Sequence, residues 1–165
     1  MKIGLLSDTH GYLDERIFDY FSDRDEIWHA GDIGEPAIIE KLAGFKMTRA
    51  VFGNIDGPRI RNSVPEELIF DCSGLNIWMT HIAGYPPRYT HEIRRRLKDF
   101  TPNLLVCGHS HILRIIKDQN FPNLTFMNPG AAGRQGFHRK RTIIRFEIKS
   151  GHLGNVQVIE LGDRG

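Results

Sequence analysis

The sequence predicts an α/β protein in which two mixed β-sheets pack face to face with helices on the outside. In the first half of the 165-residue chain, short apolar runs alternate with helical patterns, and this alternation is typical of parallel strand pairing. In the second half, apolar runs follow one another through turns such as residues 120–123 and 149–152, which indicates an antiparallel contribution. Parallel and antiparallel pairing in one small chain favours two mixed sheets.

The expected strands are short apolar runs, rich in β-branched residues and bounded by polar or turn-forming positions. In chain order they are residues 2–7, 26–29, 49–52, 68–71, 76–80, 104–107, 113–117, 124–127, 141–148 and 156–161.

Three helices are expected, at residues 14–22, 36–42 and 90–100. Ile17 and Phe21 lie four residues apart in the first, so they share one helix face. Pro36 suits the first turn of the second helix, because its missing N–H has no partner there anyway. In the third, Thr90 is a plausible N-cap and Pro102 ends the helical pattern.

The composition is that of an ordinary globular domain, with 40% hydrophobic and 25% charged residues. This excludes a disordered chain or a membrane protein, and no run approaches the ~20 apolar residues of a membrane span. The net charge of +2 gives no reason to expect a non-specific nucleic-acid or membrane surface. The basic clusters at residues 94–96 and 139–141 are interpreted as solvated faces.

Cys72 and Cys107 are too few for a disulfide framework or a zinc cluster, so two buried, reduced thiols are expected. The apolar run before Ser7 is too short for the apolar region of a signal peptide. With no repeat or linker visible, we expect a single domain over residues 1–165, located in the cytoplasm.

Five of the apolar runs end at side chains that can bind a metal. These side chains are Asp8 and His10, Asp32, Asn54, His81, and His109 with His111. Because ligands in open α/β sheets bind beyond the carboxyl ends of strands, we expect the seven to converge on one crevice. Their mixture of carboxylate, imidazole and amide oxygen suits Mn²⁺, Fe²⁺, Ni²⁺ or Zn²⁺ better than a thiolate zinc site.

Spacing within these motifs supports the same interpretation. Residues two apart on an extended segment face the same way, which applies to Asp8 with His10 and to His109 with His111. Glycines at positions 31, 53 and 108 precede Asp32, Asn54 and His109, and a glycine lets the backbone turn and approach closely.

Each of these residues also has a simpler explanation when it is taken singly. Asp8 or Asp32 could cap a helix, Asn54 could form a turn, and His81 could be a half-buried imidazole. Their common position at strand ends is what favours a metal site.

In their order, these motifs resemble the calcineurin-like metallophosphoesterase superfamily, closest to its small single-domain bacterial and archaeal branch, to which a retromer subunit of the same fold is related. The matching segments are Asp8-Thr-His10, Gly31-Asp32, Gly53-Asn54-Ile55-Asp56, Thr80-His81, Gly108-His109-Ser-His111 and Asn128-Pro129-Gly130.

The resemblance implies a four-layer α/β/β/α sandwich and two divalent ions per chain. One ion would be held by Asp8, His10, Asp32 and His111, and the other by Asp32, Asn54, His81 and His109, so that Asp32 bridges the pair. It also implies a two-metal phosphoesterase, acting through a hydroxide that bridges the ions and is generated at neutral pH. Mn²⁺ is the first expectation, with Ni²⁺, Zn²⁺, Fe²⁺ and Mg²⁺ as alternatives.

Two departures from the family pattern shape the expected activity. Ile55 stands where many members carry a histidine that can protonate the leaving group, and Ile82 follows His81 in place of the usual glycine. General acid catalysis contributes ~10²–10⁴-fold. We therefore expect a modest phosphodiesterase that prefers good leaving groups, with Asn54 and Asp56 as the candidate catalytic residues.

Further roles are assigned with alternatives left open. Asp56 and the backbone near His29 are candidates to fix the imidazole ligands, or else a turn cap and strand packing. Tyr85 and Arg88, on a proline-rich loop after His81, are candidate substrate contacts or part of a rigid surface loop. Arg134 and His138 have the same two interpretations.

The expected partner is a small phosphodiester, with no membrane and no specific nucleic acid. Homo-oligomers are an expectation drawn from family members of this size. The main rival to an enzyme is a non-catalytic scaffold on the same fold that keeps a residual metal site. Scaffold drift should erode ligands, yet all seven are present, which favours the enzyme. A nuclease is disfavoured by the small chain and the near-neutral charge.

Overall fold

The computed structural model describes residues 1–165 and contains two five-stranded mixed sheets, which confirms the predicted fold class. The first sheet has the order β12-β11-β1-β2-β3. Its strands are β1 (Lys2–Leu6), β2 (Glu26–His29), β3 (Met47–Ala50), β11 (Lys140–Lys149) and β12 (His152–Asp163). Strands β1, β2 and β3 pair in parallel, whereas β11 pairs antiparallel with both β1 and β12.

The second sheet has the order β4-β5-β8-β10-β9. Its strands are β4 (Glu67–Cys72), β5 (Leu75–Thr80), β8 (Leu104–Val106), β9 (Arg114–Lys117) and β10 (Thr125–Asn128). The central strands β5, β8 and β10 are parallel, and the two edge strands are antiparallel to their neighbours. A separate two-stranded ribbon is formed by β6 (Gly84–Tyr85) and β7 (Arg88–Tyr89).

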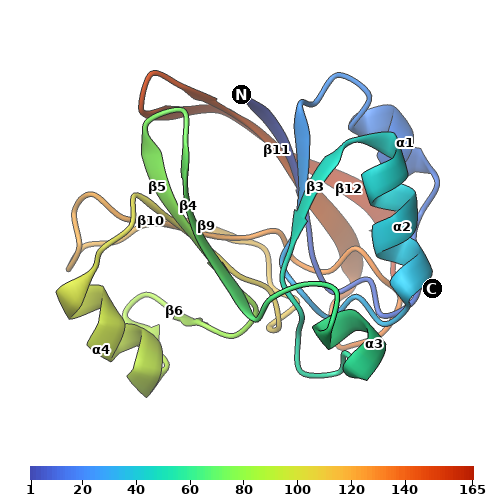
Figure 1. Cartoon of the computed structure of the whole chain (residues 1–165), viewed down its shortest axis with the longest axis horizontal. Coiled ribbons are helices and arrows are strands. Elements are labelled where there is room, and N and C mark those ends of the chain that lie inside the picture. The colour runs from blue at the N-terminus through green and yellow to red at the C-terminus, as the bar shows by residue number, and fades with distance from the viewer.

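Helices cover the outer faces of both sheets, which gives four layers (Figure 1). On the side of the first sheet lie α1 (Arg16–Tyr20), α2 (Pro36–Phe45) and α3 (Pro58–Arg61), and on the side of the second lies α4 (His91–Asp99). Thr90 caps α4, because its side chain accepts a hydrogen bond from the Ile93 backbone at 3.3 Å. None of the helices is long and apolar enough to cross a membrane.

Three apolar clusters hold the layers together. The central one packs the inner faces of the two sheets, with Trp28, Met79 and Phe146 fully buried in it. The second cluster lies between the first sheet and its helices and includes Ile17. The third lies between the second sheet and α4 and includes Leu97 of that helix. Full burial of such side chains contributes ~1.5–3 kcal/mol each. This packing fixes the two sheets face to face, with their parallel strands ending at the same side of the molecule.

Some elements differ from the sequence prediction. Strand β12 is longer than residues 156–161, because pairing with β11 sets its length and most of its side chains are exposed, which leaves no alternation to detect. Helix α1 is shorter than residues 14–22. The Asp14 carboxylate accepts a hydrogen bond from the Arg16 backbone N–H, so Asp14 precedes the helix and is not part of it. Helix α3 and the β6–β7 ribbon are too short to give a periodic signal.

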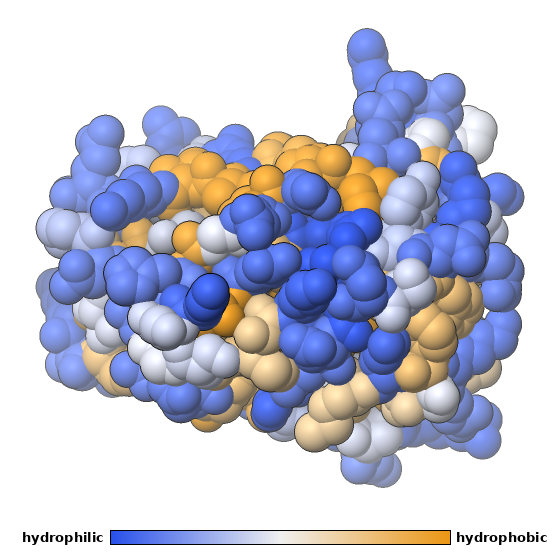
Figure 2. All heavy atoms as spheres, turned by 90° about the horizontal axis from the view of Figure 1, so that it is seen from above, coloured by the Kyte–Doolittle hydropathy of each residue, from blue (hydrophilic) through white to orange (hydrophobic).

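Both cysteines are buried and unpaired, as predicted. Viewed from above, the end of the sandwich that carries the amino terminus shows apolar side chains gathered between hydrophilic flanks (Figure 2). The parallel strands run away from this end, so their carboxyl ends lie at the opposite side of the molecule.

Candidate metal centre

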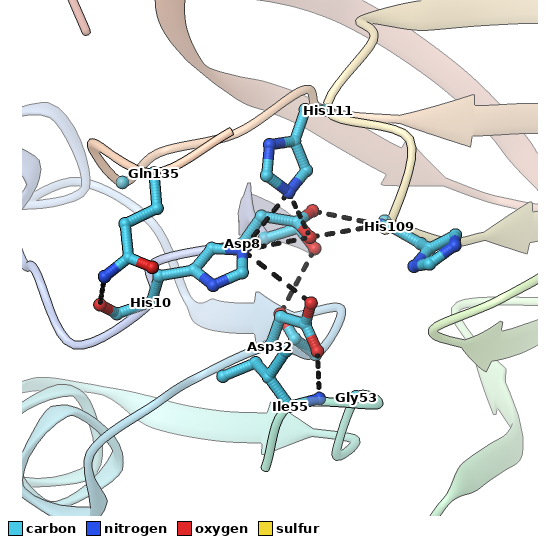
Figure 3. Close-up of polar contacts among 12 residues, drawn as sticks. Asp8, His10, Asp32, Gly53, Ile55, His109, His111 and Gln135 are labelled. Atoms are coloured by element: carbon cyan, nitrogen blue, oxygen red, sulfur yellow. Dashed lines mark hydrogen bonds and ion pairs between the residues drawn. The ribbon is translucent and has the colours of Figure 1, made fainter. Parts of the chain in front are cut away.

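The seven side chains predicted as ligands come together at the carboxyl ends of β1, β2, β3, β5 and β8. Figure 3 shows five of them, Asp8, His10, Asp32, His109 and His111. They form two groups of potential metal ligands. One group contains Asp8, His10 and His111, and the other contains Asp32, His81 and His109, with the ligand atoms of each group within 4.8 Å of one another. Asn54, an amide, joins the second group through His109.

Distances in the first group fit a common cation. The Nε2 atom of His111 lies 3.2 Å from the Oδ1 atom of Asp8 and 3.2 Å from the Nε2 atom of His10. Two ligands that each lie ~2.1 Å from one ion are roughly 3 Å apart, which is the separation found here.

The second group has the same spacing. His81 Nε2 is 3.2 Å from Asp32 Oδ1, and His109 Nδ1 is 2.9 Å from Asn54 Oδ1. The other oxygen of Asp32, Oδ2, lies 3.7 Å from His10 Nε2 in the first group. Asp32 thus directs one carboxylate oxygen toward each group.

His81 carries the clearest sign that a cation belongs here. Its Nδ1 lies 2.8 Å from the carbonyl oxygen of Ala30 and donates to it, so Nε2 is the nitrogen with the free lone pair. Nε2 is buried and has no hydrogen-bond partner, because this lone pair and the Asp32 carboxylate oxygen 3.2 Å away are both acceptors. Such an unsatisfied buried atom costs ~1–3 kcal/mol, and coordination of a metal would remove that cost.

Electrostatics at His81 point the same way. Burial by itself lowers the pKa of His81, yet the Asp32 and Asp8 carboxylates outweigh burial and leave the pKa raised. Two buried carboxylates therefore demand positive charge at this position, and a divalent cation supplies it more fully than one proton.

Backbone strain is concentrated at the ligands. Five of the eight non-glycine residues with positive φ are predicted ligands, namely Asp8, His10, Asp32, His109 and His111. Left-handed backbone costs an L-residue on the order of 1–2 kcal/mol, and such strain clusters at functional sites. Here it turns the side chains that follow the strands back toward a common centre.

Two glycines are required by close approach, as the sequence pattern predicted. A Cβ at Gly53 would lie 2.1 Å from the Oδ1 atom of Asp32, and a Cβ at Gly31 would lie 2.6 Å from the Nδ1 atom of His81. Any larger residue at either position would displace a ligand.

A second histidine orients His111. His138 Nε2 donates to the Gly133 carbonyl at 3.0 Å, so its Nδ1 carries no proton. This Nδ1 accepts a hydrogen bond from His111 Nδ1 at 3.2 Å. This arrangement leaves His111 Nε2 free to face Asp8. Burial lowers the pKa of His138, which favours the neutral form that this arrangement needs. No local pattern predicts this contact, since the two histidines are 27 residues apart in the chain.

Asp56 ties two of the ligand loops together. Its oxygens accept the backbone N–H groups of Ile33, Gly34 and Gly53 at 3.1, 2.8 and 2.7 Å. It forms no hydrogen bond to an imidazole, and the acceptor for His81 is instead the Ala30 carbonyl beside His29. The structure thus places Asp56 behind the ligands, where it fixes the loops that carry Asp32 and Asn54.

The structure connects neither Tyr85 nor Arg88 to the ligands by a hydrogen bond or ion pair. They face each other across the β6–β7 ribbon, and Tyr85 packs with the cluster under α4. The Arg114 guanidinium stacks on the Tyr85 ring at 4.0 Å. Arg134 stacks on Tyr12 at 4.1 Å, in the loop that follows His10.

Comparison with known proteins identifies the family. The model of the calcineurin-like phosphoesterase superfamily domain matches residues 1–151. The chain belongs to this superfamily. It is 29% identical over 138 residues to a protein named probable metallophosphoesterase from Methanothermobacter thermautotrophicus, covering 79% of this chain and 77% of that protein. It is 30% identical over 137 residues to another of that name from Methanocaldococcus jannaschii, covering 79% of this chain and 68% of the relative.

Among solved structures, the chain is similar to the Vps29 of Entamoeba histolytica complexed with Zn²⁺. The TM-score is 0.72 at 16% identity, and all of both chains is covered. This likeness confirms the superfamily fold, while the relatives' names support a phosphoesterase.

Proposed function

We propose that this member of the superfamily is a phosphodiesterase that works with two divalent ions, one at each ligand group. The observation that carries the proposal is the pair of donor clusters with Asp32 between them, directing one oxygen to each. The relatives' names support the broader class of phosphoesterase.

Two divalent ions bound together supply Lewis acidity, which activates water and clamps phosphate oxygens for in-line displacement. The protein's part is to hold them with fixed charge. Asp8 and Asp32 are almost completely buried and offset cationic charge, whereas Asn54 offers a neutral oxygen that preserves it. His81 and His111 are held in the required tautomers by backbone and by His138.

The side chain that follows Asn54 directs the proposal toward diesters with good leaving groups. Ile55, which follows Asn54, is 45% exposed and cannot transfer a proton. Its backbone N–H instead donates to Asp32 Oδ1 at 3.1 Å. A leaving group that departs as a stable anion needs no protonation, so aryl diesters should react faster than alkyl monoesters.

Mn²⁺ is the proposed metal, because oxygen and imidazole donors without thiolate suit it, with Ni²⁺, Zn²⁺, Fe²⁺ and Mg²⁺ as competitors. We also propose that the enzyme acts in the cytoplasm on a small diester. The alternative of a scaffold is prompted by the Vps29 likeness, and retention of all seven ligand side chains in bonding positions disfavours it.

The direct test is a metal screen on stripped protein. Mn²⁺, Ni²⁺, Zn²⁺, Mg²⁺ and Fe²⁺ are each added with a panel of aryl and alkyl phosphodiesters and monoesters. We expect metal-dependent hydrolysis of aryl diesters that Asp32→Ala and Asn54→Ala reduce by at least 100-fold. Asp99→Ala, an exposed carboxylate on α4, is the matched control. Activity indifferent to Asp32→Ala, or no turnover with any metal, would contradict the proposal.

A further inference from the structure

The surface next to the metal centre has two hollows, each bordered by a different ligand group. The smaller, of about 190 Å³, lies beside Asn54 and His81 and is also lined by Arg61 and Glu66. The larger, of about 570 Å³, begins at His111 and His138. His111 and the Gly53–Ile55 segment lie on opposite sides of the Asp8 and Asp32 carboxylates (Figure 3).

This disposition matches the shape of a phosphodiester. A diester carries two ester groups on one phosphorus, whereas a monoester carries one. A phosphate held between the two ligand groups could extend one ester group along each hollow. The larger hollow, of about 570 Å³, has room for a bulky group.

Apolar side chains line the larger hollow and are left open to solvent. Ile112 is 51% exposed, Leu113 is 36% exposed, and Val158 of β12 is 45% exposed. His111 lines the same hollow, so these apolar side chains lie beside a predicted metal ligand. An apolar ester group that covers this surface removes it from water, which favours binding. A polar or small ester group would leave most of it exposed.

Charge at the rim limits what can bind. Lys140 is neutralised by Glu160 and Asp163 at 2.8 and 2.9 Å. Arg139 is exposed and forms no ion pair. Its positive charge disfavours a cationic ester group in the hollow, whereas a neutral or anionic group is compatible with it.

We propose that the hollow beside His111, Ile112, Leu113 and Val158 is a substrate subsite for an apolar ester group, aryl or alkyl, of the diester. This inference rests on the proposed phosphodiesterase activity and makes it more specific. The subsite binds the ester group that stays on the phosphorus, and it selects diesters in which that group is large and apolar.

Two substrates with the same leaving group test this subsite. Bis(p-nitrophenyl) phosphate and methyl p-nitrophenyl phosphate both release p-nitrophenolate, and they differ only in the second ester group. The quantity measured is the ratio of their kcat/KM values in the metal-loaded full chain. This ratio cancels effects on metal loading and on the leaving group.

The variants are Val158→Ser and Leu113→Ser, with Val156→Ser as the matched control. Val156 is a valine of the same strand, 37% exposed, that does not line the hollow. We expect Val158→Ser and Leu113→Ser each to lower the preference for the bis-aryl substrate by about tenfold. Val156→Ser should leave the ratio unchanged, and thermal unfolding should show that all three variants fold.

An unchanged ratio in both hollow variants, with diesters still hydrolysed, would overturn the subsite while the proposed activity stands. The same conclusion follows if the variants alter self-association in sedimentation and leave the ratio alone, because a second copy would then cover the hollow. Failure of every diester with every metal would instead overturn the proposed function itself.

Discussion

His111 illustrates how a single hydrogen bond sets the chemistry of a ligand. An imidazole can present either nitrogen, and the partner of the other nitrogen decides which. The Gly133 carbonyl fixes the tautomer of His138, and His138 in turn accepts the Nδ1 proton of His111. His81 is fixed by the Ala30 carbonyl in the same way, but with backbone alone.

His111 is oriented by a side chain, whereas His81 is oriented by backbone, so only the partner of His111 can be removed by substitution. His138→Ala should weaken divalent metal binding at the group of Asp8, His10 and His111 by about 10–100-fold, because His111 loses its orienting partner. Metal affinity is measured by competition with a chromophoric chelator. His91→Ala, an exposed histidine at the start of α4, is the control. Unchanged affinity for both ions in His138→Ala would show that the contact does not orient the ligand.

His29 provides a prediction on pH. It is fully buried, its Nδ1 accepts from Gly31 N–H and its Nε2 contacts Thr9 Oγ1, and burial lowers its pKa from 6.5 to about 4. Between these values the unfolded chain takes up a proton that the folded chain does not. The free energy of unfolding should therefore fall as pH decreases from 6.5 to 4, by up to about 3 kcal/mol from this residue.

Burial also lowers the pKa of His10 and of His109, so the His29 contribution is obtained as a difference. Metal-stripped wild type and His29→Gln are unfolded with urea from pH 7 to pH 4. The variant is expected to be less stable at pH 7 and to show a shallower dependence on pH. Equal slopes in the two proteins would contradict the assignment of a buried neutral imidazole.

At the scale of elements, the site depends on the loops that follow the strands. Strands β11 and β12, near the end of the chain, are hydrogen-bonded to the segment that follows the first of these loops. Buried Arg141 of β11 donates to Asp14, ahead of α1, at 2.8 Å and to the Leu161 carbonyl of β12 at 3.0 Å. The Arg16 guanidinium, together with Arg141, holds the pKa of Asp14 well below its usual range, despite burial. This network joins three elements of the first sheet and its helix layer.

We expect Arg141→Met to lower the free energy of unfolding at pH 7 by about 3 kcal/mol. The substitution removes one buried donor to Asp14, which keeps Arg16, and the donors to the Leu161 and Asp163 carbonyls. Arg145→Met is the matched control on the same strand. Arg145 pairs with the half-exposed Asp23, and such surface pairs contribute less than about 1 kcal/mol. The free energy of unfolding of both variants is measured with urea. Equal decreases would show that the buried Arg141 network contributes no more to stability than the surface pair of Arg145.

Elements were predictable from the sequence where a local pattern carries them. The strands β1, β2 and β5 are apolar runs with clear ends, and the ligand after each is visible in the sequence. The loops that support the ligands were not predictable. The His138 contact exists only because β11 returns antiparallel to β1, and the backbone N–H groups that Asp56 accepts come from two separate loops. These are tertiary contacts with no spacing to reveal them.

At the scale of the whole molecule, the two sheets are joined through the metal centre as well as through their core. Asp8 and Asp32 follow strands of the first sheet, whereas His81, His109 and His111 follow strands of the second. An ion bound by ligands from both sheets would hold the carboxyl ends of the strands together. Binding should therefore stabilise the fold as a whole.

Metal removal tests this coupling. At a free metal concentration of about 100 times the Kd, binding to the folded chain alone adds roughly 2.7 kcal/mol for each ion. For a domain of this size the Tm should fall by roughly 5–10 °C for each ion that a chelator removes. Asp32→Ala should show little response to metal or chelator. A wild-type Tm indifferent to the chelator would mean that the two ligand groups do not bind ions in the folded state.

We infer that Asp32 is shared by two metal sites on one chain, and equilibrium dialysis against Mn²⁺ counts the ions bound. We expect two ions per wild-type chain, one in His10→Ala, and loss of tight binding at both sites in Asp32→Ala. Two tightly bound ions in Asp32→Ala, or fewer than two in the wild type at saturation, would contradict it.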